Sequence, residues 1–238
     1  MNTPGRYVGY DLVTGDAEAA REFYAAVLGW NDGTPAPYTL SEARDGGTPH
    51  WIARVGVDDV DDAVRRAERM GAHVRAPAAD VGGTGRLAVL TDPQGVPFAM
   101  LSPEGEATLP DLGAPGSVAW HELQTESHES AWRFYSELFG WKHERTYDMG
   151  PFGPYLIFGY ANEPGSEGLG GMFDIMDTPG APPVWRFYFL VSNLEAALQR
   201  VSERGGQLLH GPSPVPGGGR IAQCADPQGA LFGLTSAT

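Results

Sequence analysis

Cysteine is nearly absent from this 238-residue chain, and lysine is equally rare. Cys224 is the only cysteine, so no intramolecular disulfide can form and a reducing cytoplasm is the simplest compartment for the protein. Lys142 is the only lysine among 16 basic residues, which face 30 acidic ones. The resulting formal net charge of −14 argues against nucleic acid or an anionic membrane as the main partner.

Long apolar runs are absent as well. No stretch approaches the ~18 consecutive apolar residues of a membrane-spanning helix, and residues 1–5 have neither the basic start nor the apolar run of a secretory signal. We therefore expect a soluble, cytoplasmic protein. A chain of this length suits two domains, each long enough to bury a hydrophobic core.

A tandem repeat is the strongest positive signal in the sequence. Segment 120–141 carries a Phe-Tyr pair at 134–135 and closes on Gly-Trp. Segment 9–30, which lies 111 residues upstream, has the same pattern with Phe-Tyr at 23–24. A repeat in this register predicts two structural units of the same kind.

The period of the apolar residues predicts the same elements in each repeat, a strand and a helix followed by further strands, twice over. In repeat one we expect a strand at 6–14, a helix from the N-cap Asp16 to Gly29, a strand at 51–57, a helix from 58 or 59 to Gly71, and strands at 73–74, 86–91 and 96–101. In repeat two the first helix begins at the N-cap Ser127 and ends at Gly140. The central strand is expected at 185–191, and the second helix ends at Gly205. Residues 102–116, rich in proline and glycine, predict a linker between domains at 1–101 and 117–238.

The two repeats differ in one segment. The second halves match at an offset of 134, so that Trp51 corresponds to Trp185 and the Asp-Pro-Gln-Gly turn at 92–95 to that at 226–229. The segment before the central strand has 20 residues at 31–50 but 43 at 142–184. Repeat two therefore has room for a full hairpin, with 155–160 pairing with 170–173, and we expect the pockets of the two repeats to be unequal.

These motifs resemble the vicinal oxygen chelate superfamily, which includes glyoxalase I, extradiol dioxygenases and bleomycin resistance proteins. More narrowly, the chain is similar to two-domain, glyoxalase-like "hydroxylase" members, some of them from antibiotic biosynthesis clusters. The resemblance implies an α+β fold of two tandem domains, each made of two βαβββ modules whose mixed sheet forms a cup for a small molecule. Whether modules pair within one repeat or across both stays open.

The resemblance also implies where a metal would be held. Family members place histidine or a similar ligand on the first and central strands and glutamate on the last strand. The corresponding residues here are Gly9, Ile52 and Ala99 in repeat one, and Trp120, Arg186 and Gly233 in repeat two. None is an ordinary metal ligand, so we expect neither a metal nor another cofactor, and glyoxalase or extradiol chemistry in its usual form is excluded.

Two carboxylates are the candidate catalytic groups. Alternation along a strand puts Glu122 on the same face as Trp120, and Asp11 is its equivalent in repeat one. A carboxylate facing an aromatic cup would be poorly solvated and suited to proton transfer. Alternatively, each carboxylate caps a neighbouring backbone group or pairs with an arginine. By the same alternation His121 should face away from the cup, towards a helix or solvent, and His128 should be solvated.

The candidate substrate-binding residues line the same predicted cup. Arg186 and Tyr188 share a face of the central strand, with Arg54 at the place of Tyr188 in repeat one; a buried arginine needs a carboxylate, either from the protein or from a ligand. The remaining candidates are aromatic or lie at the rim of the cup, and simple core filling is the alternative for the aromatic ones: Trp120, Trp185, Tyr155, Phe232 and His50.

Two function classes follow from these residues. One is a metal-independent enzyme that moves a proton on an aromatic or polyketide-like metabolite, giving isomerisation, cyclisation or cofactor-free oxygenation. The other is a binding protein that sequesters a toxic small molecule, as in bleomycin resistance. In both cases the expected partner is a hydrophobic or aromatic small molecule, with no nucleic acid and no membrane, and the protein is a monomer or homodimer.

Overall fold

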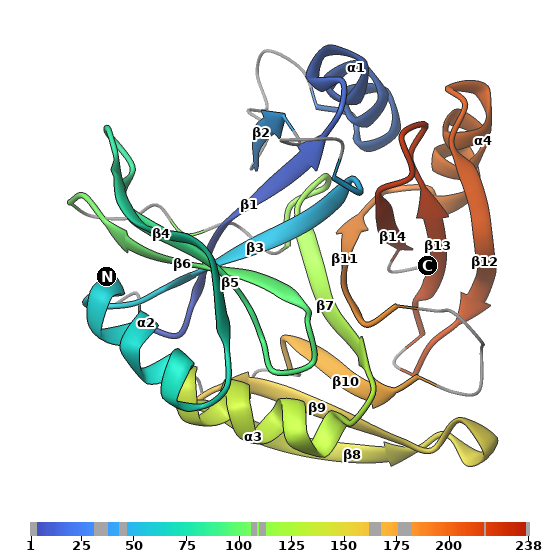
Figure 1. Ribbon diagram of the computed structural model, residues 1–238. Coiled ribbons are helices and arrows are strands. Elements are labelled where there is room, and N and C mark those ends of the chain that lie inside the picture. The colour runs from blue at the N-terminus through green and yellow to red at the C-terminus, as the bar shows by residue number, and fades with distance from the viewer. Residues whose placement is uncertain are drawn as a thin grey trace. The chain divides into compact units, whose positions relative to one another are not determined.

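A computed structural model describes residues 4–30, 38–42, 47–105, 109, 113–161, 168–175, 182–216 and 218–236 (Figure 1). Repeat one contains β1 (Tyr7–Thr14), α1 (Ala17–Leu28), β2 (Tyr38–Glu42), β3 (His50–Gly56), α2 (Val60–Arg69), β4 (His73–Val81), β5 (Gly85–Thr91) and β6 (Pro97–Pro103). Repeat two contains β7 (Val118–Thr125), α3 (His128–Phe139), β8 (Trp141–Asp148), β9 (Pro154–Tyr160), β10 (Gly170–Asp174), β11 (Val184–Leu190), α4 (Leu194–Glu203), β12 (Gln207–Pro214), β13 (Arg220–Ala225) and β14 (Leu231–Ser236).

The strands of each repeat form one mixed sheet. Their orders are β2-β1-β3-β6-β5-β4 and β12-β13-β14-β11-β7-β10-β9-β8. In both sheets the central strand runs parallel to the last strand, β3 with β6 and β11 with β14, and an antiparallel pair lies at one edge, β4 with β5 and β12 with β13. The predicted α+β class, with two repeats of the same kind, is therefore confirmed.

The helix boundaries follow the predicted capping residues. Asp16 accepts a hydrogen bond from the backbone N–H of Ala19, and α1 ends at Gly29 in the left-handed conformation. Ser127 and Gly140 do the same for α3. Among the described residues, no helix is long and apolar enough to cross a membrane.

The extra residues of repeat two form the hairpin that the sequence predicted. β9 pairs antiparallel with β10, with Gly170 opposite Phe158, and β8 pairs antiparallel with β9. β10 lies parallel to β7, and β2 lies parallel to β1 in the corresponding place of repeat one. Residues 31–37 and 43–46 of the shorter segment lie outside the described residues, as do 106–108 and 110–112 of the predicted linker. The domain boundaries at 101 and 117 stay a prediction.

The chain divides into two compact units, and each unit contains segments of both repeats. Unit 1 comprises Met1–Gly9, Ala53–Leu109 and His121–Trp185. Unit 2 comprises Tyr10–Ile52, Pro110–Trp120 and Arg186–Thr238. Each unit thus joins the second module of one repeat to the first module of the other. The sequence left open whether modules pair within one repeat or across both, and the structure shows that they pair across both.

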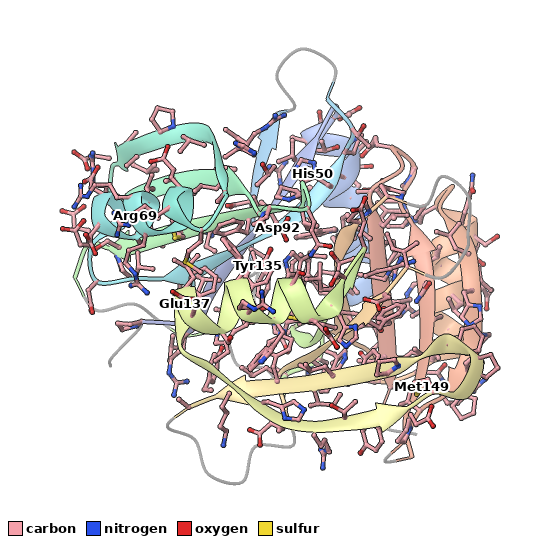
Figure 2. The ribbon with its side chains drawn as sticks, turned by 60° about the horizontal axis from the view of Figure 1, so that its bottom comes forward. His50, Arg69, Asp92, Tyr135, Glu137 and Met149 are labelled. Atoms are coloured by element: carbon pink, nitrogen blue, oxygen red, sulfur yellow. The ribbon has the colours of Figure 1, made fainter. Side chains whose placement is uncertain are left out.

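A buried chain of hydrogen bonds lies in the core of unit 1. The Trp185 indole donates to the hydroxyl oxygen of Tyr135 at 3.1 Å, and that hydroxyl donates to Oδ2 of Asp92 at 2.9 Å (Figure 2). The other carboxylate oxygen of Asp92 accepts from the backbone N–H groups of Gln94 and Val96. The Phe-Tyr motif of repeat two is therefore bonded to the Asp-Pro-Gln-Gly turn of repeat one.

Unit 2 contains an equivalent series of buried hydrogen bonds, in which the two repeats exchange roles. The Trp51 indole donates to Tyr24 at 2.9 Å, and Tyr24 donates to Asp226 at 3.1 Å. Asp226 in turn accepts from the backbone N–H groups of Gln228 and Ala230. The two sequence motifs that identified the repeat are thus the two partners of one buried hydrogen bond, made once in each unit.

A glycine of one repeat closes the end of the first helix of the other. Trp141 donates its indole N–H to the carbonyl of Gly5 at 2.7 Å, where Gly5 has a φ of 78°. Trp30 donates to the carbonyl of Gly116 at 2.9 Å, where φ is 83°. Positive φ favours glycine at both positions, and a side chain on Gly5 would also overlap the carbonyl of Phe139 at the end of α3.

We expect Tyr135→Phe and Tyr24→Phe to destabilise the protein by similar amounts, roughly 2–4 kcal/mol each, because each leaves an indole N–H and a carboxylate oxygen buried without a partner. Urea unfolding at pH 7 measures the loss. Tyr147→Phe, at a side chain that is 36% exposed, is the matched control and should change the free energy of unfolding by less than about 0.5 kcal/mol. Equal stability of all three variants would contradict a structural role for the buried chain.

Candidate functional site

One face of the β7-β10-β9-β8 segment in unit 1 points away from α3. On the opposite face, Phe158 stacks on Trp141 at 4.6 Å between ring centroids, and Trp141 stacks on Tyr135 of α3 at 5.8 Å. Side chains alternate along a strand. Ile157 and Tyr155, which lie one and three residues before Phe158 on β9, therefore face away from the helix.

Glu122 belongs to this outward face. Its register partner on β10 is Gly171, whereas the next pair, Leu123 and Met172, is fully buried on the helix side. The Glu122 side chain is 7% exposed, and its Oε2 accepts a hydrogen bond from the hydroxyl of Tyr155 at 3.2 Å. The structure therefore brings together two of the residues predicted for the site.

Gly171 is the residue that permits this contact. Tyr155 lies on β9 and Glu122 on β7, so the phenol must cross β10, which lies between them. A side chain at position 171 would overlap the Tyr155 ring and its hydroxyl oxygen. The absence of a Cβ atom on Gly171 lets the ring lie across the strand and reach the carboxylate.

The surroundings of this pair are aromatic. The ring of Phe173 lies 5.7 Å from that of Tyr155, and Tyr147 is the register partner of Tyr155 on β8. The guanidinium carbon of Arg145 lies 5.7 Å from the centre of the Tyr147 ring. We call this surface the Glu122 face, defined by Glu122, Gly171, Phe173, Tyr155 and Tyr147.

Unit 2 has a different arrangement on the corresponding face of its strands. Tyr188 is 1% exposed, and its hydroxyl accepts a hydrogen bond from Nε2 of Gln223 at 3.0 Å. Its register partner is Gly233, where any side chain would overlap the Tyr188 ring. The phenol therefore fills the space above the last strand.

The residues at the family's metal-ligand positions do not fit a divalent cation. In repeat one, the Arg54 guanidinium would lie 2.6 Å from a Cβ atom on Gly9, so a positive charge covers that position of the first strand. In repeat two, Tyr188 covers Gly233. Among the described residues, no group of three His, Cys, Asp or Glu side chains is placed to hold a metal ion.

Several other predicted site residues have the contacts of core residues. Phe232 is fully buried and packs edge-on against Phe23 and Tyr24 of α1. Trp185 is 5% exposed and belongs to the buried hydrogen-bond chain of unit 1. For both, core filling describes the environment that the structure shows.

The remaining predicted residues lie on the strands where the sequence placed them. Asp11 on β1 and Trp120 on β7 are half-buried, and Arg186 on β11 is 5% exposed. Arg54 is half-buried on β3. At the start of β3, the ring Nδ1 of His50 lies 2.8 Å from the carbonyl oxygen of Thr48, so this ring already has a local partner.

The core of unit 1 also holds a small apolar cavity of about 10 Å³ between Tyr7, Phe98, Trp141 and Trp185. This is about the space of one water molecule. It is too small for a metabolite, so it is not a candidate substrate site.

The structure decides the environments of two histidines. His121 is fully buried, stacks on Tyr7 at 3.8 Å, and has its Nδ1 2.7 Å from the carbonyl oxygen of Leu169, so of the two surroundings expected for it, a helix or solvent, solvent is excluded. His128 is 8% exposed and its Nδ1 lies 2.9 Å from Asp174, so the prediction of a solvated ring was wrong. The contacts with Leu169 and Asp174 come from the β9–β10 hairpin, whose register could not be known from sequence.

The residues that sequence analysis missed are Gly171, Phe173 and Tyr147. The predicted pairing of 155–160 with 170–173 was the available signal, because it puts Gly171 beside β9. Only the register shows that the Tyr155 ring crosses this glycine.

The fold and these sites define a two-repeat, glyoxalase-like α+β protein. The model of the Glyoxalase/Bleomycin resistance protein/Dioxygenase superfamily matches residues 117–234, and the model of the Glyoxalase-like domain matches residues 8–101. The chain belongs to the glyoxalase/bleomycin resistance protein/dioxygenase superfamily.

Curated relatives match almost the whole chain. "Putative glyoxylase CFP32" of Mycobacterium tuberculosis is 29% identical over 245 residues, which cover 94% of this chain and 92% of that protein. "Anthracycline biosynthesis protein DnrV" of Streptomyces peucetius is 29% identical over 262 residues, which cover 97% of this chain and 93% of that protein.

Solved structures share the architecture. The Mn(II)-bound glyoxalase from Novosphingobium aromaticivorans aligns with a TM-score of 0.67 at 16% identity, over 100% of this chain and 83% of that one. The 2,2',3-trihydroxybiphenyl 1,2-dioxygenase from Sphingomonas wittichii aligns with a TM-score of 0.67 at 11% identity, over 99% and 91%. At these identities the likeness shows the fold alone.

Burial of His121 predicts an acid-sensitive step in stability. Burial lowers the pKa of His121 from 6.5 to about 4, so the folded protein holds the ring neutral while the unfolded chain protonates it. The protonation of this histidine therefore does not affect the free energy of unfolding above pH 6.5. The free energy of unfolding falls by on the order of 3 kcal/mol as the pH drops from 6.5 towards 4, because only the unfolded chain gains the proton. His121→Gln should lower stability at pH 7 and flatten this dependence, as measured by urea unfolding from pH 7 to 4. His143→Gln, which replaces an exposed ring, should show the same dependence of stability on pH as the wild type. If His121→Gln also kept that dependence, its assignment to His121 would be contradicted.

Proposed function

We propose that the Glu122 face binds a planar, enolisable aromatic metabolite and that Glu122 acts as its general base. The observation that carries this proposal is a carboxylate 7% exposed that accepts a hydrogen bond at 3.2 Å from Tyr155, whose ring lies 5.7 Å from that of Phe173. Such a site supplies apolar contact for fused rings and one proton acceptor at a fixed place.

The proposed reaction begins with a proton transfer. The Glu122 carboxylate accepts a proton from a carbon that is next to a substrate carbonyl or conjugated with it through an aromatic ring, and the electron pair of the broken C–H bond forms an enolate. Tyr155 orients the carboxylate by its hydrogen bond, and its hydroxyl is the donor proposed for the enolate oxygen. Return of the proton to another carbon gives isomerisation, attack on a second carbonyl gives cyclisation, and reaction with O₂ gives oxygenation. Asp11 is the second candidate base.

The proposed chemistry uses no metal ion. Arg54 covers the first-strand position of repeat one and Tyr188 the last-strand position of repeat two, so two of the six positions where the family would place a ligand are covered by other side chains. The acceptor for the substrate proton and the donor for its oxygen both come from side chains of the chain itself.

Similarity to DnrV supports the proposed substrate class. That protein is named for anthracycline biosynthesis, and anthracyclines are aromatic polyketides with fused rings. A cytoplasmic location, in keeping with the single buried cysteine, would suit an enzyme of this kind.

The alternative proposal is a non-catalytic binding protein that sequesters a toxic aromatic compound. The rings of Tyr155, Phe173 and Tyr147 favour it, because stacking and apolar contact need no ionisable group. Experiments that separate affinity from turnover distinguish the two proposals.

Glu122→Gln should lower turnover and leave affinity nearly unchanged. The probe is anthrone, a three-ring ketone with an enolisable methylene, whose deuterium exchange is followed by NMR under anaerobic conditions. Loss of the general base should slow bound-state exchange by about 10²–10⁴-fold. Glu137→Gln, at an exposed residue of α3, is the matched control (Figure 2). Trp120→Ala should instead weaken binding by about 1–3 kcal/mol, measured by equilibrium dialysis.

Normal exchange in both Glu122→Gln and Asp11→Asn would contradict the carboxylate mechanism. If Trp120→Ala still weakened binding in that case, the sequestering protein would be the better account.

We also expect the purified protein to hold no stoichiometric transition metal, because an arginine and a tyrosine cover the ligand positions. Elemental analysis should find far less than one ion per chain, and chelator treatment should leave anthrone exchange unchanged. Close to one zinc, iron, nickel or manganese per chain, with activity lost on chelation and restored by the metal, would overturn this expectation.

A further inference from the structure

Gln124 is a polar residue on the same side of β7 as Glu122, and the proposed proton transfer does not use it. It lies two residues after Glu122, so strand alternation places both side chains on the outward face. Leu123 and Thr125, which point to the other side of the strand, are fully buried, whereas Gln124 is half-buried. The Gln124 amide therefore lies on the face to which the substrate is proposed to bind.

The neighbouring strand places an aromatic ring beside Gln124. Phe173 on β10 is the register partner of Gln124, as Gly171 is of Glu122. The Phe173 ring lies 5.7 Å from the ring of Tyr155, which bonds to Glu122. A ligand whose rings contact Phe173 and Tyr155 thus has an edge next to a polar amide, an arrangement typical of small-molecule sites.

The hydrogen-bonding capacity of Gln124 distinguishes it from the other half-buried glutamines. Gln94 bonds to both backbone groups of Ser127, Gln223 donates to Tyr188, and Gln228 accepts from Thr14. Within the part of the chain that the structure describes, the side chain of Gln124 forms no hydrogen bond. Its amide has two N–H donors and a carbonyl acceptor that a ligand can bond.

Packing of the strand does not require an amide at this position. By the offset of 111 residues, the counterpart of Gln124 in repeat one is Val13 on β1. Valine is a usual strand residue, so a polar side chain here adds no propensity for the strand. The amide is found in the repeat that also carries Glu122 and Tyr155.

The spacing of Glu122 and Gln124 suits two contacts with one ligand. Residues two apart on a strand are separated by roughly 7 Å, and each hydrogen bond adds about 3 Å to the distance that the ligand itself spans. A fused-ring ketone can therefore present its acidic carbon to Glu122 and a substituent oxygen to Gln124. A bare ring edge would leave the amide groups unpaired and partly desolvated, which costs affinity.

We propose that Gln124 determines substrate specificity on the Glu122 face. Its amide forms a hydrogen bond with an oxygen substituent of the bound ring system, so the face favours hydroxylated fused-ring ketones over unsubstituted ones. This inference rests on the proposed function of the Glu122 face and narrows its substrate class.

The test compares two ligands that differ only in oxygen substituents. Dithranol is anthrone with a hydroxyl group on either side of its carbonyl, and each added oxygen can accept a hydrogen bond. Equilibrium dialysis under anaerobic conditions gives the Kd of both ligands for the full-length protein. In Gln124→Met, the ratio of the anthrone Kd to the dithranol Kd should fall about three- to tenfold, because only dithranol loses a hydrogen bond.

Two further variants and one rate complete the experiment. Gln124→Leu repeats the substitution with an apolar side chain of another shape, and circular dichroism establishes that each variant is folded. Gln207→Met is the matched control, since Gln207 is an exposed glutamine on β12 of unit 2, and it should leave the ratio unchanged. Bound-state deuterium exchange of anthrone should stay near the wild-type rate in Gln124→Met, because Glu122 and Tyr155 are intact.

The outcomes separate this inference from the proposed function. An unchanged ratio in Gln124→Met and Gln124→Leu overturns the role of Gln124, even if Glu122→Gln abolishes exchange. An equal rise in Kd for both ligands also overturns it, because a purely structural role gives no selectivity. A lower ratio in Gln124→Met together with normal exchange in Glu122→Gln supports the Gln124 contact and contradicts the general base. Failure of the wild type to bind either ligand contradicts both proposals.

Discussion

The buried hydrogen bond between a helix tyrosine and a turn aspartate is the interaction on which the rest of this structure depends. In unit 1 it joins Tyr135 to Asp92, and in unit 2 it joins Tyr24 to Asp226, so each bond connects one repeat to the other. Burial raises the pKa of both aspartates, and backbone N–H groups together with the tyrosine hydroxyl oppose that shift. A carboxyl in this position is tolerated only when its hydrogen bonds are made, which favours the exchanged pairing of modules.

Other contacts between the repeats support the same pairing. Arg66 on α2 donates to the carbonyl of Glu137 at the end of α3, and Arg200 on α4 donates to the carbonyl of Val27 at the end of α1. In each unit, a helix of one repeat thus satisfies carbonyl groups that the helix end of the other leaves open. The core of each unit is therefore a joint product of both repeats.

The structural asymmetry between the repeats has a simple steric origin. In repeat two, the hairpin brings Tyr155 across Gly171 to Glu122, and the family's ligand positions hold no ordinary metal ligand. A solved glyoxalase with the same fold binds Mn(II). In this chain Arg54 and Tyr188 instead cover two of the strand positions where the family places metal ligands.

The sequence by itself determined the repeat, the helix caps at Asp16 and Ser127, the hairpin of repeat two, and the lack of ordinary ligands at the metal positions. These features depend on local periodicity, on single-residue chemistry or on the matching of one repeat to the other. Tertiary structure alone decided that modules pair across repeats, that Trp185 and Phe232 belong to cores, and that His121 is buried. It also decided that Glu122 meets Tyr155, because that contact depends on the register of three strands and on the missing side chain of Gly171. Sequence spacing constrains neighbours along the chain, but it does not specify which of two equivalent partners a repeated module will choose.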